Sequence, residues 1–408
     1  MLNGMRVIEF ADGIAGPSAG LHLAELGADV IKLEEGEGDW SRGAAAAMSD
    51  GSSTTFHALN RGKRSVALGS SPDEARPLMQ ALLRTADVLI TDRTPEELSP
   101  YGIDASGDLL FPANSRLITC VISPWGRRGP LAGRKGSELT SQAMSGYTRY
   151  LGSYGKPACR LGADVGSLGS GLFALQGILA AIYSRNRTNK GQRVDISLVN
   201  SLLAMKSIHL AAQSDPDAYE GPRVGGANHT PERGWKTADR PIYLQFGGSV
   251  GPEGKPGWVN FIKEVGLDHM LDDPRCDKGG RKTTGHGLYT HEFREDYEKA
   301  FKRYTAEQIT AIVKKHGGNA AIYIDAKETL AHPQTQALDI VRTAPGRKSG
   351  ESHQVRAFPA RFSRLKPKVP GVAPEIGEHT QAVAAQAGID EKVLALMTEQ
   401  GGLKRGAG

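Results

Sequence analysis

The chain has 408 residues, 39% of them hydrophobic and 23% charged, with a net charge of +5. This is the composition of an ordinary globular protein of about two domains. The mild positive charge suits an anionic ligand, and because the chain has no dense basic and aromatic stretch we expect no nucleic-acid partner. We also expect a cytoplasmic protein with no membrane partner, because no apolar run approaches the roughly 20 residues that span a bilayer, no signal peptide is recognisable and three scattered cysteines suit a reducing compartment.

The first third of the chain alternates short apolar strands with helices. Arg6–Phe10 predicts a strand, and a helix that opens at Gly16-Pro17 should end at Gly27, before a strand at Val30–Leu33. The same alternation continues with strands at Ser65–Leu68, Asp87–Ile90 and Leu117–Ile122 and a helix after Ser71-Pro72. Strands that alternate with helices predict an α/β domain with a parallel sheet.

The rest of the chain divides at a linker. Long helices are expected at Leu168–Arg185 and Ile196–Leu210, followed by residues 215–240, which are rich in Gly, Pro and charge. A second region then carries strands at Pro241–Phe246 and Asn319–Ile324, helices at Trp258–Val265, Tyr297–Arg303 and Ala306–Lys315, strands and turns in Pro345–Pro374, and terminal helices at Thr380–Ala387 and Glu391–Gln400.

Asp164 is the most informative residue. It lies in the Gly/Ser-rich segment Gly162–Gly169, just before the longest apolar helix, and a second signature, Thr188–Ser197, follows that helix. Alone, such an aspartate is usually a helix cap or a turn former. The glycines at 13, 16 and 20 do not have the dinucleotide-binding spacing, so an NAD-dependent dehydrogenase is disfavoured.

Taken in chain order, the motifs resemble the family III CoA-transferases of the CaiB/BaiF type, over nearly the whole chain. The matching segments are Gly4–Phe10, Ala15–Pro17, Leu26–Glu34, Gly38–Arg42, Asn60–Ser65, Gly162–Gly169, Thr188–Ser197 and Ile376–Thr380. The resemblance implies a large Rossmann-like CoA-binding domain built from residues 1–215 and 345–408, with a smaller α+β domain from residues 216–344. It also implies two chains intertwined as an interlocked dimer.

In that family an aspartate at the position of Asp164 is the covalent nucleophile. A carboxylate is already ionised at neutral pH and needs no base. It would attack an acyl-CoA, form a mixed anhydride and pass coenzyme A to an acceptor carboxylate, with no metal required. The resemblance implies loop and oxyanion support from Gly16, Gly162, Gly166 and Glu138, and CoA contacts from Ile14, Ala15, Arg42, Asn60, Lys63, Asp92, Arg93 and Ser137.

The chain departs from the family at several positions. Glu35 stands where some formyl-type members have a basic residue, and Arg93 is a candidate to restore that cation. The stretch that covers the active site is expected at residues 225–235 or 247–257. The related racemases have a His-Asp pair where this chain has Ser137-Glu138, which disfavours racemisation.

Several functions remain open at this stage. The leading hypothesis is an acyl-CoA:carboxylate CoA-transferase, with succinyl-CoA or another dicarboxylic CoA ester as donor. The alternatives are a racemase or an intramolecular CoA isomerase of the same fold, and a non-catalytic partner subunit of a hetero-oligomer. The acids exchanged do not follow from the sequence. Candidates for shaping the acyl pocket are Trp40, Phe56, His57, Tyr147 and Trp235, and candidates for holding a distal carboxylate are Arg149, Arg160 and Arg233.

Overall fold

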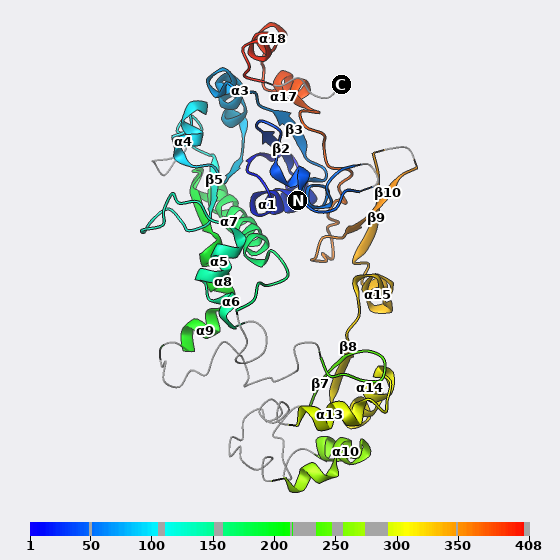
Figure 1. Cartoon of the computed structure of the whole chain (residues 1–408). Helices are drawn as coiled ribbons and strands as arrows, with labels where there is room; N and C mark the ends of the chain where they lie inside the picture. The colour runs from blue at the N-terminus through cyan, green and yellow to red at the C-terminus, as the bar shows by residue number, and fades with distance from the viewer. Residues whose placement is uncertain are drawn as a thin grey trace. The chain divides into compact units, whose positions relative to one another are not determined.

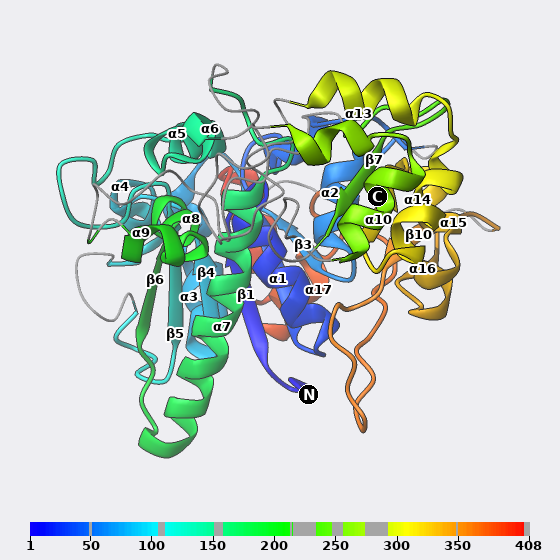
Figure 2. The ribbon, with the colours of Figure 1, turned by 90° about the horizontal axis from the view of Figure 1, so that it is seen from below.

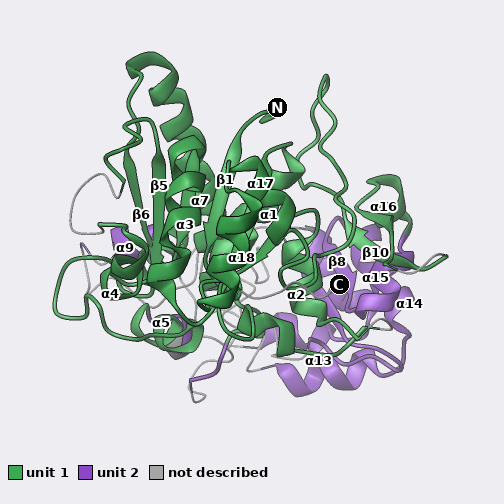
Figure 3. Ribbon diagram, turned by 90° about the horizontal axis from the view of Figure 1, so that it is seen from above, with its two compact units in different colours: residues 1–145, 161–205, 333–408 green, residues 146–160, 206–332 purple. Residues whose placement is uncertain are grey.

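The computed structural model describes residues 1–48, 51–104, 111–150, 158–212, 214, 234–246, 256–273, 293–347 and 350–403. The chain divides into two compact units, drawn in green and purple in Figure 3. Unit 1 comprises residues 1–145, 161–205 and 333–408, and unit 2 comprises residues 146–160 and 206–332. These limits differ from the expected domain limits, because residues 333–344 belong to unit 1, and residues 146–160 and 206–215 belong to unit 2.

Unit 1 is built on a six-stranded parallel sheet with the strand order β3-β2-β1-β4-β5-β6. Its strands are β1 (Arg6–Phe10), β2 (Asp29–Glu34), β3 (Arg64–Ala67), β4 (Val88–Thr91), β5 (Ile118–Ser123) and β6 (Arg193–Ser197). The predicted α/β class and parallel sheet are confirmed. The order is that of Rossmann-type sheets, in which successive strands are added on one side of β1 up to β3 and on its other side from β4 onward.

Helices cover both faces of this sheet (Figure 1). They are α1 (Ala15–Glu25) and α7 (Val165–Thr188) on one face, and α3 (Pro72–Thr85), α17 (Thr380–Gln386) and α18 (Glu391–Glu399) on the other. Successive strand side chains point to opposite faces, so Val7 packs with α1 and α7 whereas Ile8 packs with α3 and α17. Helices α1 and α7 also pack directly against each other (Figure 2).

Helix α7 is the one helix, among the described residues, that is long and apolar enough to cross a membrane, with a mean hydropathy of 1.7 over its most apolar window. That window is 56% buried within the protein. Ala174, Ile178 and Ala181 belong to the core beneath the sheet. Its composition is thus the one expected of a core helix that packs on a sheet and on a neighbouring helix.

The remaining elements of unit 1 are short. They are η1 (Trp40–Gly43), α2 (Thr54–Asn60), α4 (Pro95–Leu98), η2 (Ser99–Tyr101), α5 (Glu138–Met144), α8 (Leu198–Met205), α16 (Pro333–Ala337), β9 (Val341–Pro345) and β10 (Ser352–Arg356). Strands β9 and β10 form an antiparallel hairpin. The prediction of one long helix over Ile196–Leu210 is wrong. Ile196 belongs to strand β6, which ends at Ser197, and α8 begins only at Leu198 and stops at Met205.

Unit 2 has its own aromatic core. An antiparallel pair, β7 (Ile242–Gln245) and β8 (Asn319–Ile322), accompanies α10 (Pro256–Glu264), α13 (Arg294–Phe301) and α14 (Ala306–Lys315). Its other described elements are α6 (Tyr147–Tyr150), α9 (Ser207–Ala212), η4 (Asp268–Asp272) and α15 (Ala326–Ala331). Trp235 is 1% exposed and packs against Tyr297. Trp235 therefore serves the core of unit 2, and its suggested role in an acyl pocket is not supported.

Candidate active site

The turn between β1 and α1, residues 11–14, lies where this fold class binds nucleotides. In sheets of this order, ligands sit beyond the carboxyl ends of the strands at the point where the order reverses. Asp12 follows β1 and Asp92 follows β4, and the Asp12 amide donates to Asp92 Oδ2 at 3.0 Å. Ile14 and Ala15 are half-buried at the start of α1. The structure thus brings three predicted CoA contacts, Ile14, Ala15 and Asp92, to this edge.

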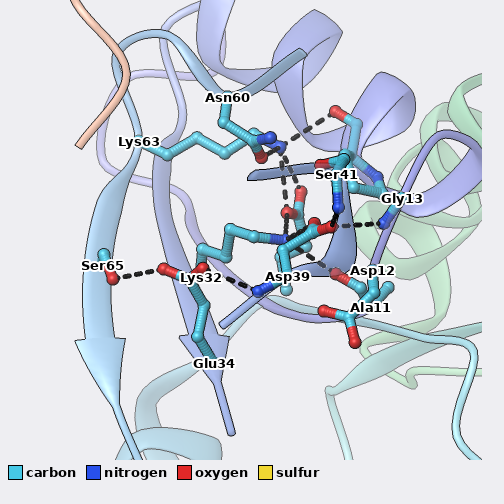
Figure 4. Close-up of polar contacts among 12 residues, drawn as sticks. Ala11, Asp12, Gly13, Lys32, Glu34, Asp39, Ser41, Asn60, Lys63 and Ser65 are labelled. Carbon is cyan, nitrogen blue, oxygen red and sulfur yellow. Dashed lines mark hydrogen bonds and ion pairs between the residues drawn. The ribbon is translucent and has the colours of Figure 1, made fainter. Parts of the chain in front are cut away.

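A buried ionic network supports the turn from inside (Figure 4). Its members, Glu9, Lys32, Asp39, Asn60 and Lys63, are each at most 3% exposed. Lys63 Nζ donates to both oxygens of Glu9, at 2.9 and 2.7 Å, and to Asn60 Oδ1 at 2.8 Å. Lys32 Nζ lies 3.2 Å from Glu9 and 2.8 Å from Asp39. Two ammonium groups face two carboxylates, so the charges balance where water cannot solvate them.

The network holds the turn through backbone atoms. Asp39 Oδ1 accepts the Gly13 N–H at 2.9 Å, Lys32 donates to the Ala11 carbonyl at 2.8 Å, and Lys63 donates to the Pro17 carbonyl at 2.9 Å. Gly13 has a φ of +76°, and a Cβ on it would lie 2.3 Å from the indole of Trp40. The turn therefore requires glycine there and a fixed network beneath it.

Asn60 and Lys63 were predicted to contact CoA. The structure instead places both side chains inside the protein and bonds them to Glu9, Phe56 and Pro17. A direct contact with a phosphate would require those bonds to be exchanged. In this arrangement their contribution to a ligand is indirect, through the position of the turn.

The pKa values in the network move in opposite directions. Burial lowers the pKa of Lys63 to about 8, against the attraction of Glu9 and with the repulsion of Lys32. Burial also acts to lower the pKa of Lys32, but Glu9 and Asp39 overcome it and raise that pKa. Burial acts to raise the pKa of Asp39, and Lys32 overcomes it and lowers that pKa. At neutral pH both lysines are charged, and as the pH rises Lys63 loses its proton before Lys32 does.

Arg42 is half-buried, and its guanidinium bonds to Glu34 and to the Pro374 carbonyl. Its Nε and Nη2 donate to the two oxygens of Glu34, each at 2.8 Å, and Nη2 also reaches the Pro374 carbonyl at 3.1 Å. The guanidinium lies 3.7 Å from the centre of the Phe56 ring. Ser65 donates to the same Glu34 carboxylate (Figure 4). The bidentate pair and the ring hold the guanidinium in one orientation.

Arg93, the candidate replacement cation, lies at the crevice but is surrounded by acidic groups. Nη2 lies 2.7 Å from Asp12, Nη1 lies 3.0 Å from Asp92, and Nε lies 3.3 Å from Glu35. Burial raises the pKa of Asp92 to about 6 despite the attraction of Arg93, and burial likewise raises the pKa of Asp12. With three carboxylates around one guanidinium, this part of the crevice is net negative at pH 7 and becomes less so near pH 6.

Asp164 stands at the N-terminus of α7. It is half-buried, it occupies the N-cap position with φ −81° and ψ 61°, and its side chain makes no capping hydrogen bond. Its carbonyl accepts the Leu168 N–H at 2.9 Å and so begins the helix. The cap interpretation of this aspartate therefore holds for its backbone and fails for its carboxylate.

Glu138 supplies the missing cap. Its Oε1 accepts the Gly166 N–H at 2.8 Å, and its Oε2 accepts the Ser167 N–H at 2.7 Å and the Ser167 hydroxyl at 2.6 Å. Partial burial acts to raise the pKa of Glu138, but the bonds from Ser167, Gln142 and Gly166 overcome it and lower that pKa. An ionised carboxylate at a helix N-terminus is favoured by the helix dipole. Glu138 is thus a structural anion at neutral pH and a poor general base.

Gln142 joins this cap to the segment before Asp164. It is fully buried, and its Nε2 donates to Glu138 at 2.7 Å and to the Ala163 carbonyl at 3.3 Å. Its Oε1 accepts the Leu161 N–H at 3.2 Å. Gln142 is not among the site residues predicted from the sequence. The signal that could have identified it is an amide side chain on a short helix that precedes the polar segment around Asp164.

The remaining predicted residues are Ser137 and three glycines, which lie at helix ends or on the surface. Ser137 is the N-cap of α5, where its hydroxyl and that of Thr140 form a capping box. Gly16 lies in the first turn of α1, where a Cβ would lie 2.4 Å from that of Ala11. Gly162 is exposed, and a Cβ on it would meet no atom of the described residues within 4 Å. The Gly166 N–H already bonds to Glu138, so an oxyanion there would compete with that carboxylate.

Two groups of predicted residues are joined through their helices. Asp164, Glu138 and Gly166 gather at the start of α7, whereas Ile14 and Ala15 gather at the start of α1. Near its N-terminal end α7 packs on the first turns of α1, where a Cβ on Gly171 would lie 2.9 Å from the Ala15 carbonyl oxygen. The expected covering stretches, 225–235 and 247–257, lie mostly outside the described residues.

The comparisons with known proteins decide the family. The sequence profile of CoA-transferase family III matches residues 2–380. The chain belongs to CoA-transferase family III. Relatives of this CoA-transferase include the formyl-CoA:oxalate CoA-transferase of Streptomyces avermitilis, which is 28% identical over 98% of both chains. They also include the succinate–glutarate CoA-transferase of Agrobacterium fabrum, which is 29% identical over 94% of this chain and 95% of the relative.

The solved structures agree with that assignment. A CaiB/BaiF family protein from Brucella suis superposes with a TM-score of 0.80 at 26% identity, over 95% of this chain and 99% of the other. The predicted resemblance and fold are confirmed. The relatives support an acyl-CoA:carboxylate CoA-transferase, with CoA thioesters as the class of substrate.

Proposed function

We propose that this CoA-transferase works through a covalent intermediate on Asp164. One observation carries the proposal: Asp164 begins α7, yet the amide donors at that helix end are taken by Glu138. A carboxylate that caps a helix has its oxygens engaged by N–H groups, which weakens it as a nucleophile. Asp164 is spared those bonds and still benefits from the partial positive charge of the helix end.

The reaction proceeds by exchange of acyl bonds. A carboxylate oxygen of Asp164 attacks the thioester carbonyl, the C–S bond breaks, and a mixed anhydride and the CoA thiolate result. The thiolate attacks the aspartyl carbonyl, which releases the first acid and leaves CoA on Asp164 as a thioester. The acceptor carboxylate then attacks that thioester, which expels the CoA thiolate and forms a second mixed anhydride. The thiolate attacks the acceptor's carbonyl in this anhydride and forms the new acyl-CoA. Asp164 is regenerated, and no step requires ATP or a metal.

Glu138 and Gln142 position the nucleophile in this proposal. Glu138 fixes the first turn of α7, and Gln142 ties Glu138 to the Ala163 carbonyl beside Asp164. Neither needs to exchange a proton. Because its pKa is lowered, Glu138 is unsuited to remove an α-proton, and Ser137 caps α5, so neither of these two residues supplies the second base that racemisation requires.

CoA is proposed to lie at the β1–α1 turn, with Ile14, Ala15 and Arg93 as its contacts. Backbone N–H groups at the start of α1 favour phosphate oxygens. Asn60, Lys63 and Arg42 support this edge through the network and the Glu34 pair. We expect the acid partner to be a dicarboxylate, since oxalate and succinate or glutarate are named for the two relatives.

The test is trapping of the intermediate. The purified chain is mixed with a panel of dicarboxylic and monocarboxylic acyl-CoAs, treated with hydroxylamine or borohydride, and weighed intact before peptide mapping. A modification at Asp164 with one ester supports the proposal and names the donor. Asp164→Asn should bind CoA without forming the adduct, and Asp73→Asn, an exposed aspartate on α3, is the matched control. An adduct that persists in Asp164→Asn, or none with any ester despite CoA binding, would overturn it.

The oligomeric state and compartment are part of the proposal. We expect an interlocked homodimer in the cytoplasm, or a hetero-oligomer with a paralogous subunit. Native mass spectrometry of the purified chain distinguishes them. A stable dimer that transfers CoA supports the first arrangement. A chain that transfers CoA only after a second polypeptide is added supports the other.

A further inference from the structure

A basic pocket lies on unit 1 at the far end of α7. It has a volume of about 830 Å³ and is lined by residues after β5, by the turn that joins α7 to β6, and by the start of β6, the edge strand. Most of that turn belongs to the signature Thr188–Ser197, whose residues have no role in the reaction proposed above. Sites for small molecules have volumes of about 300–1,000 Å³. The size of the pocket is therefore that of a ligand site.

The charge of the pocket is strongly positive. Four cations line it, Arg127, Arg128, Lys190 and Arg193, against one carboxylate, Asp195, which leaves a net charge of +3. Asp195 holds two of the cations, with Oδ1 at 2.8 Å from Arg193 Nε and Oδ2 at 3.5 Å from Arg127 Nη1. The Arg193 side chain is only 7% exposed, unlike a freely solvated arginine. One carboxylate thus orders two guanidinium groups and does not neutralise the site.

The turn that carries Lys190 is held in place. Asn189 ends α7 in the left-handed conformation, with a φ of 57°, and the Gly191 N–H donates to the Ser115 carbonyl at 2.8 Å. A Cβ on Gly191 would lie 2.1 Å from the Leu117 carbonyl oxygen, so the turn can lie this close to the sheet only with glycine. A fixed backbone that carries cations loses little entropy when it binds an anion.

The pocket is separate from the nucleophile. Helix α7 has 24 residues and begins immediately after Asp164, so at 1.5 Å per residue about 36 Å of helix separates Asp164 from this turn. The pocket also lies against β6, which β4 and β5 separate from β1, the strand that precedes the proposed CoA turn. A ligand here would therefore bind apart from the reacting acyl group.

We propose that this pocket binds a small anion with a diphosphate group. Arginine forks donate paired hydrogen bonds to phosphate oxygens, and the net charge of +3 matches the charge of a diphosphate. The diphosphate can be free or part of a nucleotide. The proposal does not depend on the role of Asp164.

The test is calorimetric titration of the full chain with inorganic pyrophosphate and, separately, with ADP. The variant is Arg128→Gln/Lys190→Gln, which removes two exposed cations without touching the Asp195 pair. The control is Arg84→Gln/Lys392→Gln, which removes the same charge from exposed positions on α3 and α18. We expect pyrophosphate binding in the wild type and in the control, weakened at least tenfold in the variant and by added salt.

The two probes distinguish the sources of the anion. Equal affinities indicate recognition of the phosphates alone, and tighter ADP binding that is lost in the variant indicates a nucleotide; both support the proposal. No pyrophosphate binding at millimolar concentration would overturn it, and so would equal losses in variant and control. If the variant binds ADP as tightly as the wild type does, ADP binds at another site. That result, together with no pyrophosphate binding, would also overturn the proposal.

Discussion

Glu138→Gln is the substitution that best tests the positioning argument. The carboxylate accepts four hydrogen bonds, from the Gly166 and Ser167 amides, the Ser167 hydroxyl and Gln142. A glutamine keeps the shape but offers one acceptor oxygen, and its own amide would face an N–H donor. Hydrogen bonds to charged groups contribute about 1.5–3 kcal/mol each, reduced by the partial exposure of the site. We expect a loss of about 2–3 kcal/mol in the free energy of unfolding of unit 1.

The same substitution should lower the rate of adduct formation at Asp164. The segment that carries Asp164 would lose its tie through Gln142, so kcat should fall about ten- to a hundredfold with KM nearly unchanged, as expected for loss of a catalytic geometry. The assays are urea unfolding and the rate of hydroxylamine-trapped product. Since folding lowers the pKa of Glu138, its stabilisation is present above the usual glutamate range and is lost as the pH falls below it, and the variant should lack that loss.

The control for this prediction is Glu96→Gln, a glutamate in the first turn of α4 that is exposed. It changes the same group at a helix N-terminus away from Asp164. Equal small effects of the two substitutions on stability and on kcat would refute the argument. A fall in stability alone, with kcat intact, would leave Glu138 as a cap and remove its role in positioning Asp164.

Three further outcomes are expected. Lys63→Met should destabilise the protein by about 3–5 kcal/mol, because it leaves the buried acceptors on Glu9, Asn60 and Pro17 without the hydrogen bonds that Nζ donates. In the wild type the low Lys63 pKa makes stability rise between about pH 8 and 10.5, where the unfolded chain holds a proton that the folded chain has lost, and the variant should lack that rise in urea unfolding. Asp92→Asn should tighten CoA binding several-fold at pH 7.5 by calorimetry and abolish its dependence on pH near 6. Gly13→Ala should cost about 1–3 kcal/mol, since φ is +76°, and should shift the fluorescence of Trp40.

Each of these outcomes has a contrary result. Lys392→Met at an exposed position should leave the unfolding profile unchanged. The same unchanged profile for Lys63→Met would mean that the buried network does not stabilise the protein. CoA affinity unaltered in Asp92→Asn would mean that CoA does not lie against the acidic crevice. Wild-type stability and fluorescence in Gly13→Ala would mean that Trp40 does not lie against the β1–α1 turn.

The sheet could be predicted because local and global signals agree along it. Strands such as Arg6–Phe10 are short apolar runs that alternate with helices, and each run predicted in the first third of the chain is a strand of the parallel sheet. Disagreement arose where two elements meet without a break, as at Ser197, where a strand passes directly into α8. Periodicity alone does not separate a strand from the first turn of the helix that follows it.

The structure gives several of the predicted site residues partners within the protein that the sequence did not indicate. The motif around Asn60 and Lys63 predicts contacts with CoA, whereas in the structure Lys63 bonds to Glu9 and to Asn60. Which partner a lysine takes depends on what lies opposite it across two strands, and Glu9 is 54 residues away. The same limitation applies to Arg93, whose guanidinium reaches Asp12 over a separation of 81 residues.

The start of α7 shows why two carboxylates at one helix end are not redundant. A helix N-terminus offers a few unpaired N–H groups, and one carboxylate is enough to satisfy the first turn. Glu138 comes from another helix and takes the amides of Gly166 and Ser167, so Asp164 can stand at the same end without capping it. If Glu138 were absent, Asp164 would be the nearest anion to those amides and would be drawn into the cap. The charge that stabilises the helix and the charge proposed to attack the substrate are therefore kept on different side chains.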